Sequence, residues 1–438
     1  MEAFKIKNGL SAKRYLGSTT TLSGSTIDLS LGSMFSTTLS SDPTYTFTNP
    51  PASGNAQAFS VEVTGGTTNF VNGAFSTDTY NGTSATKVIN NGLDLANDGG
   101  LVWIKERSGV SQHALFDTER GISKYLVSNA TSSGQASGGN MVTSFNSNGF
   151  TLGTDGSWYV NNNGYEYVSW SFKKQAKFFD VVTYTGNSVN GRQLSHNLGS
   201  TPGTVVCKRI DTGQHWILQH RSLNLSGNKT MFLSTTDALA VANDYWNSTH
   251  ASDTAITLSG HSDINGTGGT YVAYLFAHDT ADDGLIKCGS YTGTGADNPV
   301  TLGWTPGWLM IKRSNAAAAW EIMDTTRGMV SGQLVMLEAN TNAAEVNTAT
   351  ANSIGTTSTG FTVGGAGNSS NASGSTYIYM AIRGDAATDS AITWPSSVKW
   401  PSGVAPTTPA SGTKDLFTFL TTDGGTTYYG KKAAEGIA

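Results

Sequence analysis

The chain is short of the residues on which helical, disulfide-stabilised and membrane-spanning proteins depend. Charged residues make up 13% of its 438 residues, and no long stretch has the apolar spacing of an amphipathic helix. Two cysteines, Cys207 and Cys288, are too few for a disulfide framework, so we expect both to be buried free thiols. No apolar run approaches the ~18 residues of a membrane-spanning helix. The basic start, MEAFKIKNGLSAKRYLG, lacks the apolar core expected of a secretory signal.

The residues that are abundant favour an all-β fold. The chain has 52 Gly and short alternating apolar runs such as SVEVTG (60–65), TYVAYLF (270–276) and DLFTFLTT (415–422). Gly, Asn and Ser separate these runs, as they do in the turns between strands. A low-complexity segment would also be rich in Gly, Ser and Thr, but an aromatic share of 10%, with 10 Trp, indicates packed cores.

One stretch of the sequence occurs three times. The segment LVWIKERSGVSQHALFDTERG (101–121) returns as WLMIKRSNAAAAWEIMDTTRG (308–328) and, more diverged, as TVVCKRIDTGQHWILQHRSL (204–223). Each copy has an apolar run ending in a basic residue, a polar turn and a second apolar run, which predicts a β-hairpin. Lys105, Lys208 and Lys312 occupy matching positions and give a period of roughly 103 to 104 residues, long enough for each copy to be a domain.

The repeats divide the chain into three modules flanked by two shorter pieces. The modules span 67–176, 177–281 and 282–384, and their many short strands predict β-sandwiches of the jelly-roll or lectin-like kind. Residues 1–66 and 385–438 are each marginal for an independent core. We therefore predict that these two pieces fold together as one small β domain into which the modules are inserted. The linkers at 173–175 and 280–283 are short, which predicts modules in contact along a rod.

Several of these segments resemble proteins of bacteriophage particles. The segment at 9–65, which begins GLSAKRYLGSTTTLSG, resembles the amino-terminal module of marine bacteriophage virion proteins, and the segment at 392–430, which begins ITWPSSVKWPSGVAPTTPASG, resembles their carboxy-terminal pattern. The motifs WIKERSG, LFDTERG and GFTLGTDGSWYVNNNGYEYVSWSF are similar to a repeat of phage tail-fibre-like proteins with a concanavalin-like sandwich. Together these matches cover nearly the whole chain. The second module departs most, with Gln219, His220 and Arg221 at the end of its hairpin.

The resemblance implies a structural protein of the virion, and the scarcity of convergent titratable residues leads us to expect no enzymatic activity. We expect a tail-fibre-type appendage, a homotrimer whose terminal domain binds other virion proteins and whose modules attach to the host surface, with glycan as the ligand. Repeated weak contacts would add avidity. A capsid decoration or vertex head fibre, a glycan depolymerase tailspike and a secreted lectin are the alternatives. The net charge of −5 provides no basic footprint for nucleic acid.

Sugar binding requires an aromatic platform beside amide or carboxylate groups. The loop residues that offer this combination are Trp158, Tyr159, Asn161, Tyr245, Trp246, Asn247 and Trp304. The alternative for these tryptophans is that they cover sandwich edges or fill interfaces between subunits. Trp103, Trp170, Trp216, Trp308 and Trp320 stand in apolar runs and are predicted to be core residues.

Titratable residues offer little for catalysis or metal binding. Asp117 with Arg120, and Asp324 with Arg327, recur before a glycine, and we interpret each Asp as the cap of a turn over which the Arg closes. The histidines show no metal-ligand spacing. The sequence therefore predicts no cofactor and no bound metal. Calcium is the alternative, and its candidate ligands are Asp94, Asn97, Asp98, Asp263, Asn265, Asp282 and Asp283, although none has the spacing of an EF-hand.

Overall fold

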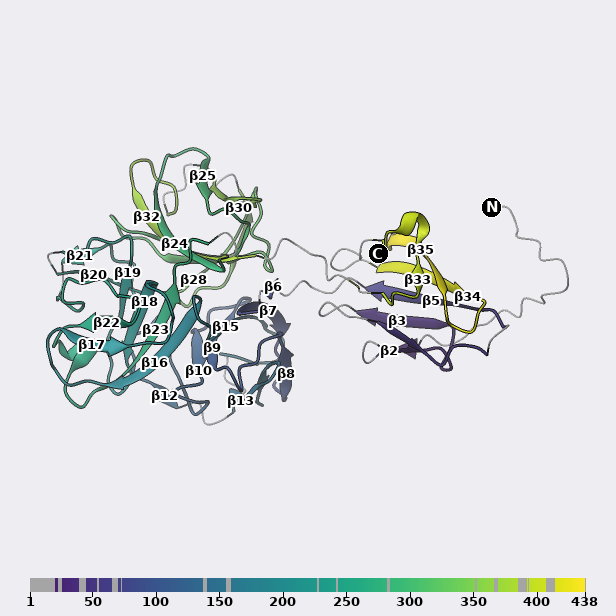
Figure 1. Ribbon diagram of the computed structural model, residues 1–438. Helices are drawn as coiled ribbons and strands as arrows, with labels where there is room; N and C mark the ends of the chain where they lie inside the picture. The colour runs from purple at the N-terminus through teal and green to yellow at the C-terminus, as the bar shows by residue number, and fades with distance from the viewer. Residues whose placement is uncertain are drawn as a thin grey trace. The chain divides into compact units, whose positions relative to one another are not determined.

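The structure, a computed structural model, confirms an all-β fold. It describes residues 20–22, 26–38, 45–52, 55–64, 70–71, 73–136, 140–154, 159–226, 228–241, 243–281, 284–350, 353–365, 369–384, 392, 394–406 and 414–437. Within these residues the helices are the single turn α1 (Ser262–Asn265) and the 3-10 turn η1 (Pro401–Gly403). No helix of the described part is long and apolar enough to cross a membrane. The chain divides into two compact units, unit 1 (Met1–Thr68 and Thr388–Ala438) and unit 2 (Asn69–Ala387), shown in Figure 1.

Unit 1 is built from both ends of the chain. Its main sheet has the strand order β1 (Thr20–Thr21), β3 (Met34–Thr38), β5 (Gln57–Thr64), β34 (Lys414–Thr421), β35 (Tyr428–Ile437) and β33 (Val398–Lys399), and β2 (Thr26–Asp28) pairs with β4 (Thr46–Thr48) beside it. The strands β5 and β34 run antiparallel and bring Phe59 opposite Phe419, whose rings stack with centroids 5.0 Å apart. The amino-terminal and carboxy-terminal pieces therefore share one sheet and one aromatic core.

Unit 2 contains three modules with matching sheets. The large sheet of module 1 has the order β10 (Ala114–Asp117), β9 (Gly100–Glu106), β15 (Glu166–Lys173), β7 (Phe75–Asn81) and β6 (Phe70–Val71). Module 2 has β16 (Phe179–Thr185), β23 (Thr270–Ala277), β18 (Pro202–Arg209), β19 (Trp216–His220), β20 (Lys229–Phe232) and β21 (Ala240–Val241). Module 3 has β24 (Ile286–Thr292), β32 (Thr376–Arg383), β26 (Pro306–Arg313), β27 (Trp320–Asp324), β28 (Gln333–Glu338) and β29 (Val346–Ala349).

A smaller sheet covers the outer side of each large sheet. These sheets are β13 (Val142–Asn146), β14 (Gly149–Leu152) and β8 (Lys87–Asn90) in module 1; β17 (Arg192–Ser195) and β22 (Ala255–Leu258) in module 2; and β25 (Asn298–Thr301), β31 (Gly360–Val363) and β30 (Ile354–Thr357) in module 3. Module 1 also has the short pair β11 (Lys124–Tyr125) and β12 (Gln135–Ala136). The repeated sequence forms the predicted hairpins, β9 with β10, β18 with β19, and β26 with β27. Each module is therefore sandwich-like.

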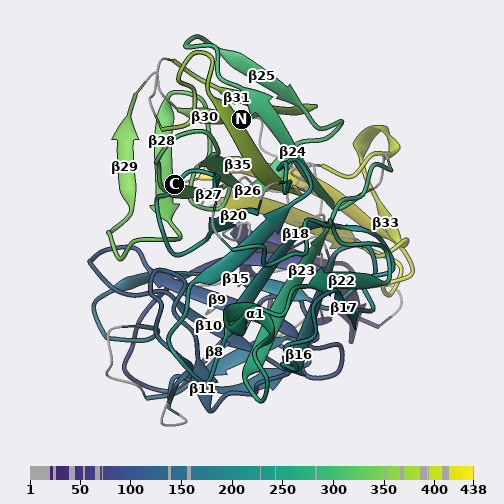
Figure 2. The ribbon, with the colours of Figure 1, turned by 90° about the vertical axis from the view of Figure 1, so that its left-hand side faces the viewer.

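In modules 1 and 3 the two faces of the large sheet face different cores, whereas in module 2 the residues of both faces belong to one core. On β15, Val168, Trp170 and Phe172 belong to a core that all three modules share, whereas Tyr167 faces the core between the two sheets of module 1. Successive side chains of a strand point to opposite faces. The sequence of a strand that is buried on both faces is therefore one continuous apolar run. Figure 1 shows β8, β17 and β25 toward the edge of unit 2, and Figure 2, turned by 90°, shows β9, β15, β18 and β23 of the large sheets nearer its middle.

The modules do not form the predicted rod. Module 1 contacts module 2, module 2 contacts module 3, and module 3 returns to contact module 1, so that the three close into a ring around the shared core. A rod would leave the shared-core face of the end modules exposed to water, and burying that apolar face favours closure. Cys207 and Cys288 are buried free thiols, as predicted.

Candidate functional site

The aromatic candidates for sugar binding are largely inside the protein. The exposed fraction is 4% for Tyr245, 1% for Trp246 and 4% for Trp304, so none of the three presents a ring face to solvent. Tyr245 and Trp246 belong to the shared core, and Trp304 to the core of module 3. The prediction that these residues form an exposed platform is therefore corrected: they pack the sandwiches. Trp158 lies outside the described residues.

Asn161 is a structural residue that occurs once in each module. Its side chain is fully buried, donates hydrogen bonds to the carbonyls of Ala85 and Gly153 (both 2.7 Å), and accepts one from the Thr83 amide (2.9 Å). Asn265 and Asn371 bind the matching loops of modules 2 and 3 in the same way. Since these contacts use both ends of the amide, neither the predicted ligand contact of Asn161 nor the calcium contact of Asn265 fits the structure.

Two candidates keep partly exposed side chains, but they lie in different modules. Tyr159 is half-buried in module 1, with its ring centroid 5.9 Å from that of Tyr125. Asn247 is half-buried in module 2, with a left-handed backbone at φ 49°. The six candidates that the structure describes therefore do not converge on one ligand site.

The calcium candidates that the structure describes take part in local hydrogen bonds or ion pairs. Asp94 accepts from the amide of Asn97 (3.0 Å) and from its side chain (2.7 Å), and these bonds lower the pKa of the Asp94 carboxyl. Asp98 pairs with Lys173 at 3.2 Å. In the described part of the chain, no three or more His, Cys, Asp or Glu side chains are placed to hold a metal ion. Asp282 and Asp283 lie outside that part.

The two Asp–Arg pairs share one geometry. In module 1 the amide of Arg120 donates to Asp117 Oδ1 (2.9 Å) and its guanidinium Nε to Oδ2 (2.6 Å). In module 3 Arg327 binds Asp324 through the same atoms at 2.9 and 2.7 Å. The turn and the arginine together satisfy most of each carboxylate, which is otherwise costly to bury.

The structure adds a partner from another module that the sequence analysis did not find. Tyr274 of module 2 donates its hydroxyl to Asp117 Oδ2 at 2.6 Å, and Trp170 of module 1 donates its indole Nε1–H to Asp324 Oδ2 at 3.0 Å. In module 2 the equivalent of these aspartates is His220, whose Nε2 lies 3.1 Å from the Tyr379 carbonyl of module 3. Burial lowers the pKa of His220 to about 4, so it is neutral at pH 7 and donates to that carbonyl. Each Asp or His therefore joins its module to the next.

A second set of equivalent residues makes the same circuit. Trp216 donates to the Val127 carbonyl of module 1 (2.8 Å), Trp320 donates to the Phe232 carbonyl of module 2 (3.0 Å), and His113 Nε2 lies 3.0 Å from the Glu338 carbonyl of module 3. The three carbonyls follow Leu126, Met231 and Leu337, which pair with the equivalent hairpin residues Leu115, Leu218 and Ile322. The ring is thus approximately threefold in its contacts as well as in its strands.

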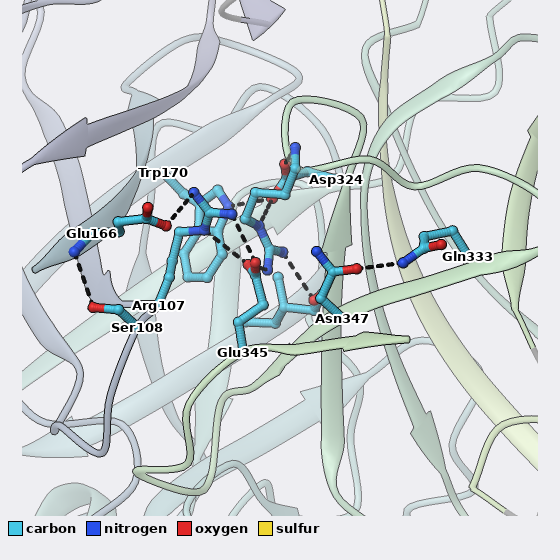
Figure 3. A network of polar contacts seen from close by, with 10 residues as sticks. Arg107, Ser108, Glu166, Trp170, Asp324, Gln333, Glu345 and Asn347 are labelled. Atoms are coloured by element: carbon cyan, nitrogen blue, oxygen red, sulfur yellow. Dashed lines mark hydrogen bonds and ion pairs between the residues drawn. The ribbon is translucent and has the colours of Figure 1, made fainter. Parts of the chain in front are cut away.

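The interface between modules 3 and 1 has additional charges, shown in Figure 3. Glu345 accepts two bonds from Arg107, at 2.8 and 3.0 Å, and a third from Arg327, at 2.9 Å. The Arg327 guanidinium also lies 5.3 Å from the ring centroid of Trp170. Although burial opposes ionisation, the hydrogen bonds and positive charges of Arg107 and Arg327 hold the pKa of Glu345 below its ordinary value. A carboxylate bound by two arginines is suited to holding surfaces together rather than to exchanging protons.

One buried acid of module 3 has no counterpart in the other modules. Glu321 on β27 lies directly across from Glu338 on β28, while the equivalent positions hold Ala114 and Ile217. Burial raises the pKa of Glu321 to about 7, even though Ser369 and Ser370 donate hydrogen bonds to it. The sequence signal for this pair was a charge within an apolar run, WEIMD, at a position where the other copies are apolar.

The comparisons with known proteins place this ring in a family. A family model described as "Domain of unknown function (DUF7483)" matches residues 72–385, nearly the whole of unit 2. The chain belongs to the DUF7483 family. The DUF7483 domain thus comprises all three modules together, and unit 1 lies outside the match. No curated protein and no solved structure matches the chain.

Proposed function

We propose that this protein is a non-enzymatic structural protein of a bacteriophage virion, a tail-fibre-type appendage that attaches to the host surface through the modules of its DUF7483 domain. The observation that carries the proposal is the closed ring of three equivalent modules. It fixes three copies of one scaffold in a defined arrangement, which suits multivalent recognition of a repetitive surface such as a glycan. The resemblance of the terminal pieces and repeats to phage appendage proteins supports the same assignment.

The use of polar groups in unit 2 fits a binding scaffold better than an enzyme. Asp117, Asp324 and Glu345 are bound by arginines at module interfaces, and Asn161, Asn265 and Asn371 hold loops together. These groups maintain the ring. Binding to a host surface would then fall to the outer loops and small sheets of the modules, which vary in sequence between copies.

Unit 1 takes the role of the attachment domain in this proposal. It is made of both chain ends, so the DUF7483 domain is an insertion in it, and a domain held at one point of the virion would present the whole ring. Self-assembly into a homotrimer and binding to tail or capsid proteins would both be functions of unit 1. A capsid decoration differs from a tail fibre only in the virion protein that unit 1 binds.

Purified full-length protein tests the proposal in two steps. The first is binding to host cells and to an array of bacterial surface glycans, where saturable binding that blocks phage adsorption is expected. The second is a cryo-EM map of the phage particle whose genome encodes this chain, in which unit 1 is expected on the tail. Absence of the chain from the particle would refute the proposal, whereas a position on the capsid would replace the tail fibre with a head appendage.

A specific observation also favours the depolymerase alternative. Glycoside hydrolases use two carboxyl groups roughly 5 to 10 Å apart, one of them with a raised pKa. Glu321 and Glu338 are cross-strand neighbours, and the pKa of Glu321 is about 7. Glu321, however, is only 3% exposed, which leaves no room for a sugar at its carboxyl group. Release of reducing ends from host polysaccharide, abolished by Glu321→Gln, would establish this alternative.

A further inference from the structure

The three interfaces of the DUF7483 ring are built on the same backbone contact. The amide of Gly134 in module 1 donates to the Ile210 carbonyl of module 2 (2.9 Å), and the amide of Leu239 in module 2 donates to the Ser314 carbonyl of module 3 (2.8 Å). The amide of Glu345 in module 3 completes the circuit by donating to the Arg107 carbonyl of module 1 (2.9 Å). This backbone contact therefore does not distinguish one interface from another.

Side chains at these positions do distinguish them. The donor and acceptor residues are glycine with isoleucine at the first interface and leucine with serine at the second. At the third they are Glu345 and Arg107, which form a two-pronged ion pair (2.8 and 3.0 Å) extended by Arg327 (2.9 Å). The Glu345 side chain is 7% exposed and that of Arg327 is fully buried, so the network is largely shielded from water.

Chain connectivity differs at the same place. Module 1 leads into module 2 between Lys173 and Phe179, and module 2 into module 3 between Ala277 and Ile286. Modules 3 and 1 have no such direct linker, because the chain passes between them only through unit 1. A short linker keeps separated partners at a high effective concentration, and this advantage decreases as the connection lengthens.

We propose that the interface between modules 3 and 1 is the seam of the ring: the interface that a buried ion-pair network holds in place of a linker, and the one that opens independently of the other two. The Arg107–Glu345–Arg327 network supplies at the seam the stabilisation that a direct linker supplies elsewhere. Opening the seam separates the Trp170–Asp324 and His113–Glu338 contacts together with the network, because all of them join the same two modules. The proposal is independent of the function proposed above.

Hydrogen exchange of full-length protein tests this, because the amides of residues 134, 239 and 345 each report on one interface. Glu345→Gln removes the charge from the network and leaves Arg107 and Arg327 without a carboxylate between them. Exchange at the seam, read from a peptide containing residue 345, is expected to accelerate on the order of 100-fold, the effect of breaking a buried ion pair. Exchange at residues 134 and 239 is expected to stay unchanged.

The matched control is Glu166→Gln. Glu166 lies 3.7 Å from Arg107, but its side chain is 59% exposed, so the same change in charge beside the same arginine is expected to leave the seam closed. Arg107→Met is a second variant for the case in which Glu345→Gln does not fold, and it too should open the seam selectively. Equal acceleration at all three amides, or unchanged exchange at residue 345 in the folded variants, would overturn the proposal.

Discussion

Replacing Glu321 by glutamine is expected to change how the stability of unit 2 depends on pH. The Glu321 carboxyl lies in the interior of module 3, opposite Glu338 and within the field of Lys312, and burial is the main reason that its pKa rises from 4.5 to about 7. Below pH 4.5 both the folded and unfolded chains hold this proton, so the shift costs no stability there. As the pH rises towards 7, the unfolded chain releases the proton and the folded chain keeps it.

The folded state therefore becomes less stable over this window, because it binds more protons than the unfolded state. A shift of the Glu321 pKa from 4.5 to about 7 corresponds to about 3 kcal/mol of folding stability, and the folded chain has lost this full amount above pH 7. Glutamine resembles the protonated acid in shape and cannot ionise. As the pH rises from 4 to 8, the free energy of unfolding of the Glu321→Gln variant should therefore increase by about 3 kcal/mol relative to that of the unsubstituted chain.

Urea unfolding at several pH values measures this difference. Tryptophan fluorescence and the hydrogen exchange of β27 are the two readouts, and the exchange of β27 reports on unit 2 alone. Two control variants are measured in the same way. Glu338→Gln removes the opposing like charge and should reduce the pH dependence without abolishing it. Glu435→Gln, at an exposed position of unit 1, should leave it unchanged. Parallel pH profiles for Glu321→Gln and the original chain would refute the reasoning.

Two further substitutions test the framework of each unit. Asn265→Ala removes the amide that binds two carbonyls and the Asn187 amide, and should destabilise unit 2 by about 2 to 4 kcal/mol in urea unfolding, whereas Ala at the exposed Asn163 should have little effect. Lys432→Met leaves the buried Asp415 carboxylate without the ammonium group 2.7 Å away and should cost unit 1 about 3 to 5 kcal/mol. If Lys432→Met destabilised unit 2 as much as unit 1, this assignment would be contradicted. The ion pair that the substitution breaks lies in the sheet of unit 1 that contains β34 and β35.

Local sequence patterns were sufficient for the elements of this fold. Alternation of apolar and polar residues and the positions of Gly, Asn and Ser predicted strands and turns, because a strand exposes successive side chains to opposite faces. The threefold recurrence of one hairpin predicted three similar modules. The five tryptophans placed in the core by their apolar neighbours, among them Trp170 and Trp320, are all buried.

The candidate sites were less predictable, because burial depends on contacts made far along the chain. Trp246 and Trp304 stand in polar loops, and only the folded module shows that those loops turn their rings inward. Asn161 looked like a surface amide until the structure placed it among carbonyls of loops that are distant in sequence. The sequence identifies the polar or aromatic group that each residue carries, but the tertiary fold determines which neighbours that group contacts.

By itself, the sequence determined that the chain is all-β, that it repeats, and that the repeats contain matching hairpins, since these properties rest on periodicities within a single strand or turn. Only the tertiary structure decided that the modules form a ring rather than a rod. The strands of the large sheets are apolar on both faces. This pattern indicates that both faces are buried, but it does not show which face contacts another module. The partners that close the ring, Arg107 with Glu345 and Trp170 with Asp324, are 238 and 154 residues apart, and no local pattern relates residues at those separations.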